Sequence, residues 1–317
     1  VQTCALPISD QALAEDWVAG ARSFTNKLWN STRFAIMNGA TIDGPLPEFS
    51  KLSNLNKWIL TRLDETIENT DNLMDQYEFG KTCDTLYKFV RDDFCDWYIE
   101  LSKALVQGED QEAEETKRVL GHVIDQILRL MHPITPFITE ELWCRFTGGE
   151  SLVKALWPKP TMVNRDATSV AVLEKVIALA TEIRRFRKDQ GLKDNQKIPA
   201  QIIGLESQGI SDFEESIRFL TKLEPLKNAP SAKLEFGSIT INLDLSQNVD
   251  VKAERARLEK DLEDRKKDLA TAAVKLNNEG FMAKAPLEVV KEIRERFATC
   301  SLEVERIQTA LAALKNE

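Results

Sequence analysis

The chain has 317 residues and a formal net charge of −9 at pH 7; 43% of its residues are hydrophobic and 29% are charged. This length and composition predict a globular protein of about two domains, and the negative charge argues against indiscriminate nucleic-acid binding, including DNA binding. No apolar run approaches the ~18 residues of a membrane-spanning helix and no secretory signal is present, so we expect a cytoplasmic protein without a membrane partner.

The first predicted element is a helix from Asp10, a typical N-cap residue, to the stop signal Asn38-Gly39. Residues 1–9 (VQTCALPIS) share no periodicity with it and match the translation of a common sequencing adapter, so we expect a non-native leader there. At about 100° per residue, one face of the helix is apolar and is predicted to be buried. That face consists of Leu13, Trp17, Phe24, Leu28 and Ala35.

The opposite face of this helix is basic and aromatic. It carries Arg22, Asn26, Trp29, Asn30 and Arg33, and residues 17–42 contain no acid. A second packing surface would bury Trp29 and leave the arginine head groups at the surface. A binding surface would instead stack unpaired RNA bases and contact phosphates. The pattern alone favours neither interpretation.

Four further stretches with helical spacing follow the turn at residues 43–49. The last two are separated by Pro133, and Thr135-Pro136 has the N-cap and first-position residues of a new helix, FITEELW. Residues 10–164 are therefore predicted to form a helical bundle. The apolar positions of the first three stretches are Leu52, Leu55, Ile59 and Leu63; Leu86, Phe89, Val90, Trp97 and Leu101; and Leu120, Val123, Ile124, Ile127, Leu128 and Met131.

Residues 165–248 combine a helix with short strands. Pro158 and Pro160 end the bundle pattern, and a helix is predicted from about Ser169 to the run EIRRFRKDQG. Composition favours an ordinary charged helix face for its basic residues, Arg184, Arg185, Arg187 and Lys188. Residues 198–205, KLEF and ITINLDL are typical of strands, and DFEESIRFLTKL is typical of a helix between them. This part is predicted to be a small α/β element.

Residues 249–317 have coiled-coil spacing. In the second half, apolar residues alternate spacings of three and four from Val290 to Leu314, and in the first half the register is imperfect at Arg265. Gly280 and Pro286 separate the halves, so an antiparallel hairpin is predicted. Residues near its tip can belong to a solvated turn or to a binding surface. The apolar positions are Leu258, Leu262, Leu269 and Leu276, then Val290, Ile293, Phe297, Cys300, Val304, Ile307, Leu311 and Leu314.

The sequence is poor in catalytic and metal-ligating groups. Its five cysteines are scattered without a C-x-x-C pair, and neither phosphate-loop nor dinucleotide glycine motifs occur. The two histidines, His122 and His132, are interpreted as packing or capping residues. Adjacent acids such as Asp92-Asp93 point to different sides of a helix and are usually solvated. We therefore expect reduced thiols and no catalytic, cofactor-binding or metal-binding residue.

Three segments resemble a known family. Residues 20–38 (GARSFTNKLWNSTRFAIMN) resemble the helix that opens the anticodon-binding domain of class I aminoacyl-tRNA synthetases, and residues 130–143 (LMHPITPFITEELW) resemble a segment shared by the valine, isoleucine, leucine and methionine enzymes. The tail, with EKDL at 259–262 and KLNNEGFMAKAP at 275–286, is similar to the coiled-coil arm of valine–tRNA ligases. The family's His-x-Gly-His motif and Lys-Met-Ser-Lys-Ser loop are absent. The resemblance therefore implies the C-terminal part of such an enzyme, without the catalytic and editing domains.

The resemblance also implies partners and binding residues. The bundle would contact the anticodon of tRNA(Val), and residues 249–317 would contact the outer corner of that tRNA. ATP and magnesium would bind only in the missing catalytic domain, which is the second expected partner, so this chain alone would be inactive. A free-standing RNA-binding adaptor and a coiled-coil protein-interaction module are the alternatives. The implied tRNA-binding residues are Arg22, Lys27, Trp29, Asn30, Arg33 and Phe34 in the bundle, and Lys275, Asn278, Phe281 and Lys284 near the hairpin tip.

Overall fold

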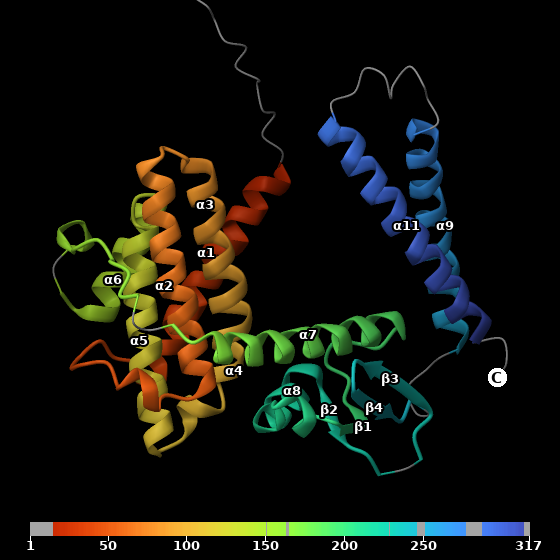
Figure 1. Ribbon diagram of the computed structural model, residues 1–317, viewed down its shortest axis with the longest axis horizontal. Helices are drawn as coiled ribbons and strands as arrows, with labels where there is room; N and C mark the ends of the chain where they lie inside the picture. The colour runs from red at the N-terminus through yellow and green to blue at the C-terminus, as the bar shows by residue number, and fades with distance from the viewer. Residues whose placement is uncertain are drawn as a thin grey trace, which may run out of the picture. The chain divides into compact units, whose positions relative to one another are not determined.

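The computed structural model describes residues 15–149, 151–162, 165–227, 229–245, 251–276 and 287–313 (Figure 1). The predicted fold class is confirmed, because the described chain is mainly helical with one small sheet. It divides into two compact units: residues 1–180 with Leu205–Leu220, and Thr181–Gly204 with Thr221–Glu317. None of the described helices is long and apolar enough to cross a membrane.

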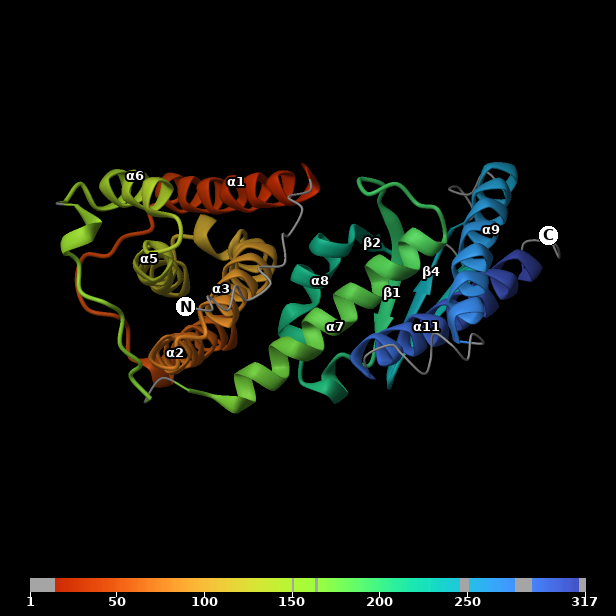
Figure 2. The same ribbon diagram turned by 90° about the horizontal axis from the view of Figure 1, so that it is seen from above.

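The first unit is a helical bundle. Figure 2 shows its helices α1 and α6 along one side, with α5 seen end-on beside them. The boundary between the units falls within helix α7, after Ala180, and most of α8 belongs to the first unit. The helices are α1 (Glu15–Met37), α2 (Asn54–Asp75), α3 (Phe79–Lys88), the π-helix η2 (Phe89–Tyr98), α4 (Ile99–Ser102), α5 (Gln111–Met131), α6 (Pro136–Thr147), α7 (Ala167–Asp189) and α8 (Glu214–Thr221). Short 3-10 helices are η1 (Phe49–Lys51), η3 (Leu105–Gln107), η4 (Leu152–Lys154), η5 (Glu206–Gln208) and η6 (Ser211–Phe213).

The predicted apolar faces form the core of the bundle. All six predicted positions of α5 are buried, and in α1 Phe24, Leu28 and Ala35 are buried as predicted. Leu13 and the side chain of Trp17 lie outside the described residues. Helix α6 starts at Pro136 as predicted, but the Thr135 hydroxyl donates to the Met131 carbonyl (3.2 Å) and makes no cap hydrogen bond.

The π-helix η2 departs from the predicted regular helix. Phe89 and Phe94 are both buried, as are Val90 and Cys95, so buried residues recur five positions apart. This is the spacing of i→i+5 hydrogen bonding. The wider turn leaves Trp97 half-buried and buries Tyr98 completely.

Gly121 in α5 allows the loop after α1 to pack directly on the helix. A Cβ atom at this position would lie 2.6 Å from the carbonyl carbon of Thr41, well inside van der Waals contact. Alanine ordinarily favours a helix over glycine by about 1 kcal/mol. We nevertheless expect Gly121→Ala to lower the free energy of unfolding by about 2 kcal/mol, because backbone atoms must move. Urea denaturation tests this; Gly80→Ala in α3, where a Cβ has nothing within 4 Å, should be neutral or stabilising.

The second unit contains a four-stranded sheet in the order β2-β1-β4-β3. Strand β1 pairs in parallel with β2 and antiparallel with β4, and β3 and β4 form an antiparallel pair. Strands β1, β3 and β4 confirm the prediction. Strand β2 was not predicted, because its three residues are too few to show an alternation of apolar and polar side chains. The strands are β1 (Ile198–Ile203), β2 (Leu223–Pro225), β3 (Ala232–Phe236) and β4 (Ile239–Leu243).

The arm consists of α9 (Val251–Leu276) and α11 (Leu287–Ala313), which pack side by side (Figure 1). Two ion pairs between the helices show that they run antiparallel, as the predicted hairpin requires. Arg265 pairs with Glu303 (3.2 Å) and Asp268 pairs with Arg296 (3.2 Å), so the residue number increases along α9 while that of its partner decreases along α11. The register break at Arg265 thus carries an ion pair between the helices. Buried positions are Leu258, Ala272, Val290, Cys300 and Val304.

Candidate nucleic-acid interface

The α1 face, defined as Arg22, Asn26, Trp29, Asn30 and Arg33, lies on the side of α1 away from the bundle core. Four of its members are exposed and Trp29 is half-buried. The opposite side holds α1 in place through the buried Phe24, Leu28 and Ala35. The exposed arginines and asparagines therefore form no second packing surface within the described residues. They offer guanidinium and amide donors to a ligand in solvent.

Trp29 contacts Arg145 of α6, a residue that the sequence pattern did not predict to be part of the interface. The guanidinium carbon of Arg145 lies 5.4 Å from the centroid of the Trp29 ring, within cation–π range. Glu141, one turn earlier in α6, accepts a hydrogen bond from Arg145 Nε at 2.5 Å. This contact depends on how α6 packs on α1, and spacing along the chain carries no signal for it. Arg145 is exposed and adds a third guanidinium beside the α1 face.

Lys27 and Phe34 lie at the edge of the α1 face. Lys27 is half-buried and forms an ion pair with Asp96 of η2. One turn further, the Ser31 hydroxyl donates to Cys95 Sγ (3.3 Å). Phe34 is half-buried. The structure thus brings the other four predicted bundle residues together on the α1 face. Lys27 lines the same surface hollow as Arg22 and Asn30 but is also paired with Asp96.

Cys95 shows that the contact between α1 and η2 is a packed one. Burial raises the pKa of its thiol to about 11, while the hydrogen bond from Ser31 acts in the other direction. The thiol is therefore protonated at neutral pH and is a poor nucleophile. Cys83, Cys95, Cys144 and Cys300 are all free thiols.

Of the four predicted residues in the arm, one can be placed. Lys275 is exposed in the last turn of α9. Asn278, Phe281 and Lys284 lie outside the described residues.

Both histidines are half-buried, His122 within α5 and His132 at its C-terminus. Burial lowers the pKa of His122, so its imidazole is neutral at pH 7. His132 Nδ1 lies 2.9 Å from the Thr139 hydroxyl, which ties the end of α5 to α6. In the part of the chain that the structure describes, no three His, Cys, Asp or Glu residues are grouped as a metal site would require.

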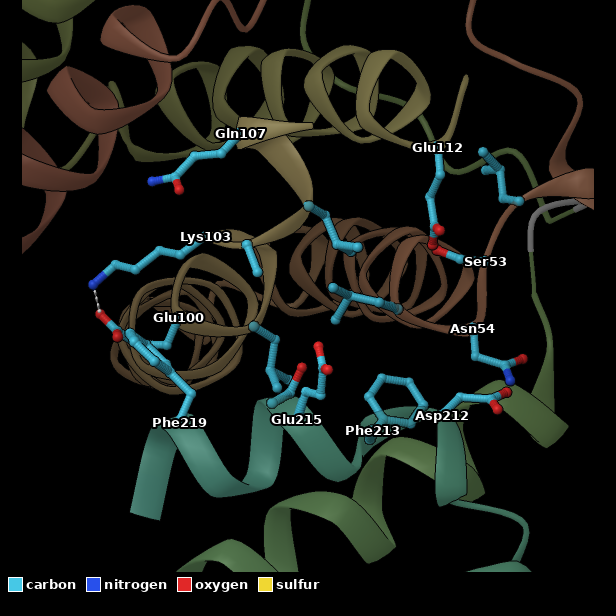
Figure 3. Close-up of a pocket in the computed structure, with 16 residues that line it drawn as sticks. Ser53, Asn54, Glu100, Lys103, Gln107, Glu112, Asp212, Phe213, Glu215 and Phe219 are labelled. Atoms are coloured by element: carbon cyan, nitrogen blue, oxygen red, sulfur yellow. Dashed lines mark hydrogen bonds and ion pairs between the residues drawn. The ribbon is translucent and has the colours of Figure 1, made fainter. Parts of the chain in front are cut away.

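A pocket of about 800 Å³ lies in the first unit at the N-terminus of α2, between α4 and α8 (Figure 3). Its apolar lining residues include Leu55, Leu101 and Phe213, the last from the segment before α8. Its charged lining residues are mainly acidic: they include Glu112, Asp212 and Glu215, and the one basic residue among the described lining residues, Lys103, is paired with Glu100 at 2.6 Å. This charge repels phosphate, so the pocket is no candidate for nucleic-acid contact.

Comparisons with known proteins point to two domains. A family model described as the anticodon-binding domain of tRNA ligase matches residues 56–202. A second one, described as the valyl tRNA synthetase tRNA binding arm, matches residues 250–315. The α1 face lies before the first matched range.

Individual relatives align with nearly the whole chain. The valine–tRNA ligase of Streptomyces coelicolor is 45% identical over 310 residues, which are 97% of this chain and 35% of the relative. That of Streptomyces avermitilis is 46% identical over 307 residues, 96% of this chain and 35% of the relative. That of Mycobacterium tuberculosis H37Rv is 42% identical over an alignment of 329 positions, gaps included, which covers 98% of this chain and 36% of the relative. The chain spans about a third of the length of these relatives.

Proposed function

We propose that this chain, which belongs to the valine–tRNA ligase family, supplies the tRNA-binding surfaces of an enzyme that attaches valine to tRNA(Val) with ATP in the cytoplasm. The bundle (residues 10–164) would contact the anticodon, residues 165–248 would connect it to the arm, and the arm (residues 249–317) would contact the outer corner of the tRNA. Catalysis, ATP and magnesium would belong to the remaining two thirds of such an enzyme, the second partner of this chain.

The observation that carries this proposal is the exposed α1 face. It occurs in a chain that matches two family models, one named for anticodon binding and the other for tRNA binding. An anticodon loop presents unpaired bases, which proteins bind by stacking on aromatic rings and guanidinium planes and by hydrogen bonds to base edges. The α1 face offers these groups in one place: Arg22, Arg33, two asparagine amides and the Trp29–Arg145 pair. A stacked base contributes about 1 to 3 kcal/mol.

The local charge of the face differs from that of the whole chain. The formal charge is −9, yet residues 17–42 contain no acid, and the α1 face carries the basic side chains of Arg22 and Arg33. Phosphates would therefore be repelled by much of the surface and attracted to this helix. This arrangement favours a defined binding register over indiscriminate electrostatic binding.

Binding of tRNA by the full chain tests the proposal. Fluorescence anisotropy at one stated salt concentration would compare a valine tRNA transcript, the same tRNA with a substituted anticodon, and an unrelated tRNA. We expect the valine tRNA to bind most tightly and the anticodon change to remove much of the difference. Equal affinity for all three would contradict anticodon recognition, and a folded chain that binds none of them would favour a protein-interaction module.

Arg33→Gln tests the α1 face itself. We expect the Kd for the valine tRNA to rise about tenfold, because a hydrogen bond to a charged group contributes about 1.5 kcal/mol and 1.4 kcal/mol is a factor of ten. The same anisotropy titration measures it. Lys51→Gln removes the same charge from an exposed position in η1 and should change the Kd little. If both variants change the Kd equally, the α1 face does not contact the tRNA.

A further inference from the structure

The basic run at the end of α7 separates into two kinds of residue in the second unit. Arg187 is 5% exposed, and its Nη2 atom donates to the carbonyls of Lys193 (3.0 Å) and Gln196 (2.6 Å). It therefore holds the loop at residues 190–197 against the helix. Arg184, Arg185 and Lys188 are exposed. Loop packing explains Arg187 and none of the other three.

The exposed members share one side of the helix. At about 100° per residue, Arg184, Arg185 and Lys188 fall within an arc of about 100° that faces away from the buried Ile183 and Arg187. Arg184 and Lys188 are one turn apart, with about 5 to 6 Å between Cβ atoms. We call these three residues, with Lys193 of the loop, the α7 surface.

The acids of this segment neutralise only part of the α7 surface. Residues 181–197 contain six basic and three acidic side chains in a chain that is acidic overall. Glu182 is paired with Arg185 at 2.5 Å, and Asp189 is paired with Arg306. Among the described residues the ammonium groups of Lys188 and Lys193 have no ion-pair partner.

The spacing of Arg184 and Lys188 is unfavourable for a solvated helix face. Such faces gain stability when opposite charges stand four residues apart, whereas like charges at that spacing destabilise the helix. Arg184 and Lys188 are a like-charged pair at that spacing. An anionic ligand bound between them would convert this repulsion into two attractive contacts.

We infer that the α7 surface binds the sugar-phosphate backbone of the tRNA, as a third contact besides the α1 face and the arm; this inference rests on the proposed function. Arginine supplies a planar fork of donors that fits a phosphate, and lysine adds a point charge. Phe186 is the only aromatic residue in residues 181–197 and is half-buried, so the surface lacks an exposed ring for stacking a base. It binds phosphates and does not recognise bases.

The double variant Arg184→Gln/Lys188→Gln of the full chain tests the inference by salt-dependent anisotropy. Loss of two phosphate contacts should raise the Kd about 10- to 30-fold near physiological salt and reduce the slope of log K against log salt by about 1.4 to 1.8. Both the valine tRNA and its anticodon-substituted form should lose affinity by the same factor. The matched control is Lys227→Gln/Lys233→Gln, which removes two exposed charges outside the α7 surface. Neither variant should unfold at a lower temperature than the wild-type chain, and Arg184→Gln/Lys188→Gln should gain slightly because the like-charged pair is removed.

The outcomes separate this inference from the proposed function. If the wild-type chain discriminates the anticodon but the double variant has the Kd and salt slope of the control, the α7 surface makes no contact and the proposed function stands. A loss confined to the valine tRNA would indicate base recognition and would overturn the phosphate assignment. If the folded wild-type chain binds no tRNA, the proposed function fails and this inference fails with it.

Discussion

Asp64→Ala is expected to lower the free energy of unfolding of the first unit by about 3 kcal/mol, because it removes the buried partner of an ion pair, whose arginine is 27% exposed, together with its hydrogen bonds. Asp64 in α2 is 4% exposed. Its carboxylate accepts hydrogen bonds from the Thr161 backbone and hydroxyl (3.0 Å to the hydroxyl), from the Met162 backbone (3.2 Å) and from Arg165 Nε (2.7 Å). One side chain thus fixes the segment that leads into α7.

Glu68→Ala is the matched control for this prediction. Glu68 binds the same arginine, at 2.8 Å from Arg165 Nη2, but its side chain is 39% exposed. Exposed pairs contribute about 0.2 to 1 kcal/mol. Urea denaturation at pH 7 should therefore separate the two variants clearly. Equal losses would show that the buried hydrogen bonds of Asp64 add nothing to its contact with Arg165.

The same carboxylate should make stability depend on acid. Burial raises the pKa of Asp64, but hydrogen bonds from Thr161 and Arg165 act in the opposite direction and prevail, so the pKa lies below its ordinary value of 3.8. The stabilisation is then fully present above the pKa of the unfolded chain and is lost as pH falls through the lower pKa of the folded chain. We expect Asp64→Asn to flatten the acid limb of the stability curve below about pH 4. An unchanged acid limb would contradict the assignment.

The parts of the fold that the sequence predicts well are those in which the spacing of buried side chains stays regular along the whole element. Helix α5 keeps a regular 3.6-residue spacing, and all six positions predicted from it are buried, among twelve buried residues in the helix. In η2 the period widens to five, and a pattern matched to a regular helix placed Trp97 in the core where Tyr98 lies. Strand β2 pairs through backbone groups over only three residues, which leave no pattern in the side chains.

The candidate interface was predictable only where it follows from one helix. The α1 wheel separates Arg22 and Arg33 from the buried Phe24, and the structure exposes both arginines. Contacts between helices could not be predicted in this way. Arg145 over Trp29 and the pairing of Lys27 with Asp96 depend on how α6 and η2 pack on α1.

A buried polar network joins three helices of the bundle and carries the last prediction. The Tyr98 hydroxyl donates to Asn56 Oδ1 (2.8 Å), and Asn56 Nδ2 donates to the Thr116 hydroxyl (2.9 Å). All three residues are at most 1% exposed, and burial raises the pKa of Tyr98, so the phenol stays protonated and can donate. Asn56 is the only member in contact with both others.

Asn56→Ala should lower the free energy of unfolding by about 3 kcal/mol, since it leaves two hydroxyl groups without partners in the core at about 1 to 3 kcal/mol each. Urea denaturation of Asn56→Ala, Tyr98→Phe and the double variant measures the coupling. Removing the orphaned phenol should restore part of the loss, so the double variant should be less destabilised than the sum of the single variants. Simple additivity would contradict the network.

The network also helps to position α1, which carries the candidate interface, through its contact with η2. Tyr98 ends η2, the same π-helix whose Asp96 pairs with Lys27 of α1. Loosening η2 should therefore loosen α1, and Asn56→Ala should increase amide hydrogen exchange in α1 under native conditions more than Gly80→Ala does. If exchange in α1 does not change while global stability falls, α1 is held by Phe24, Leu28 and Ala35 alone, and η2 has no part in positioning the α1 face.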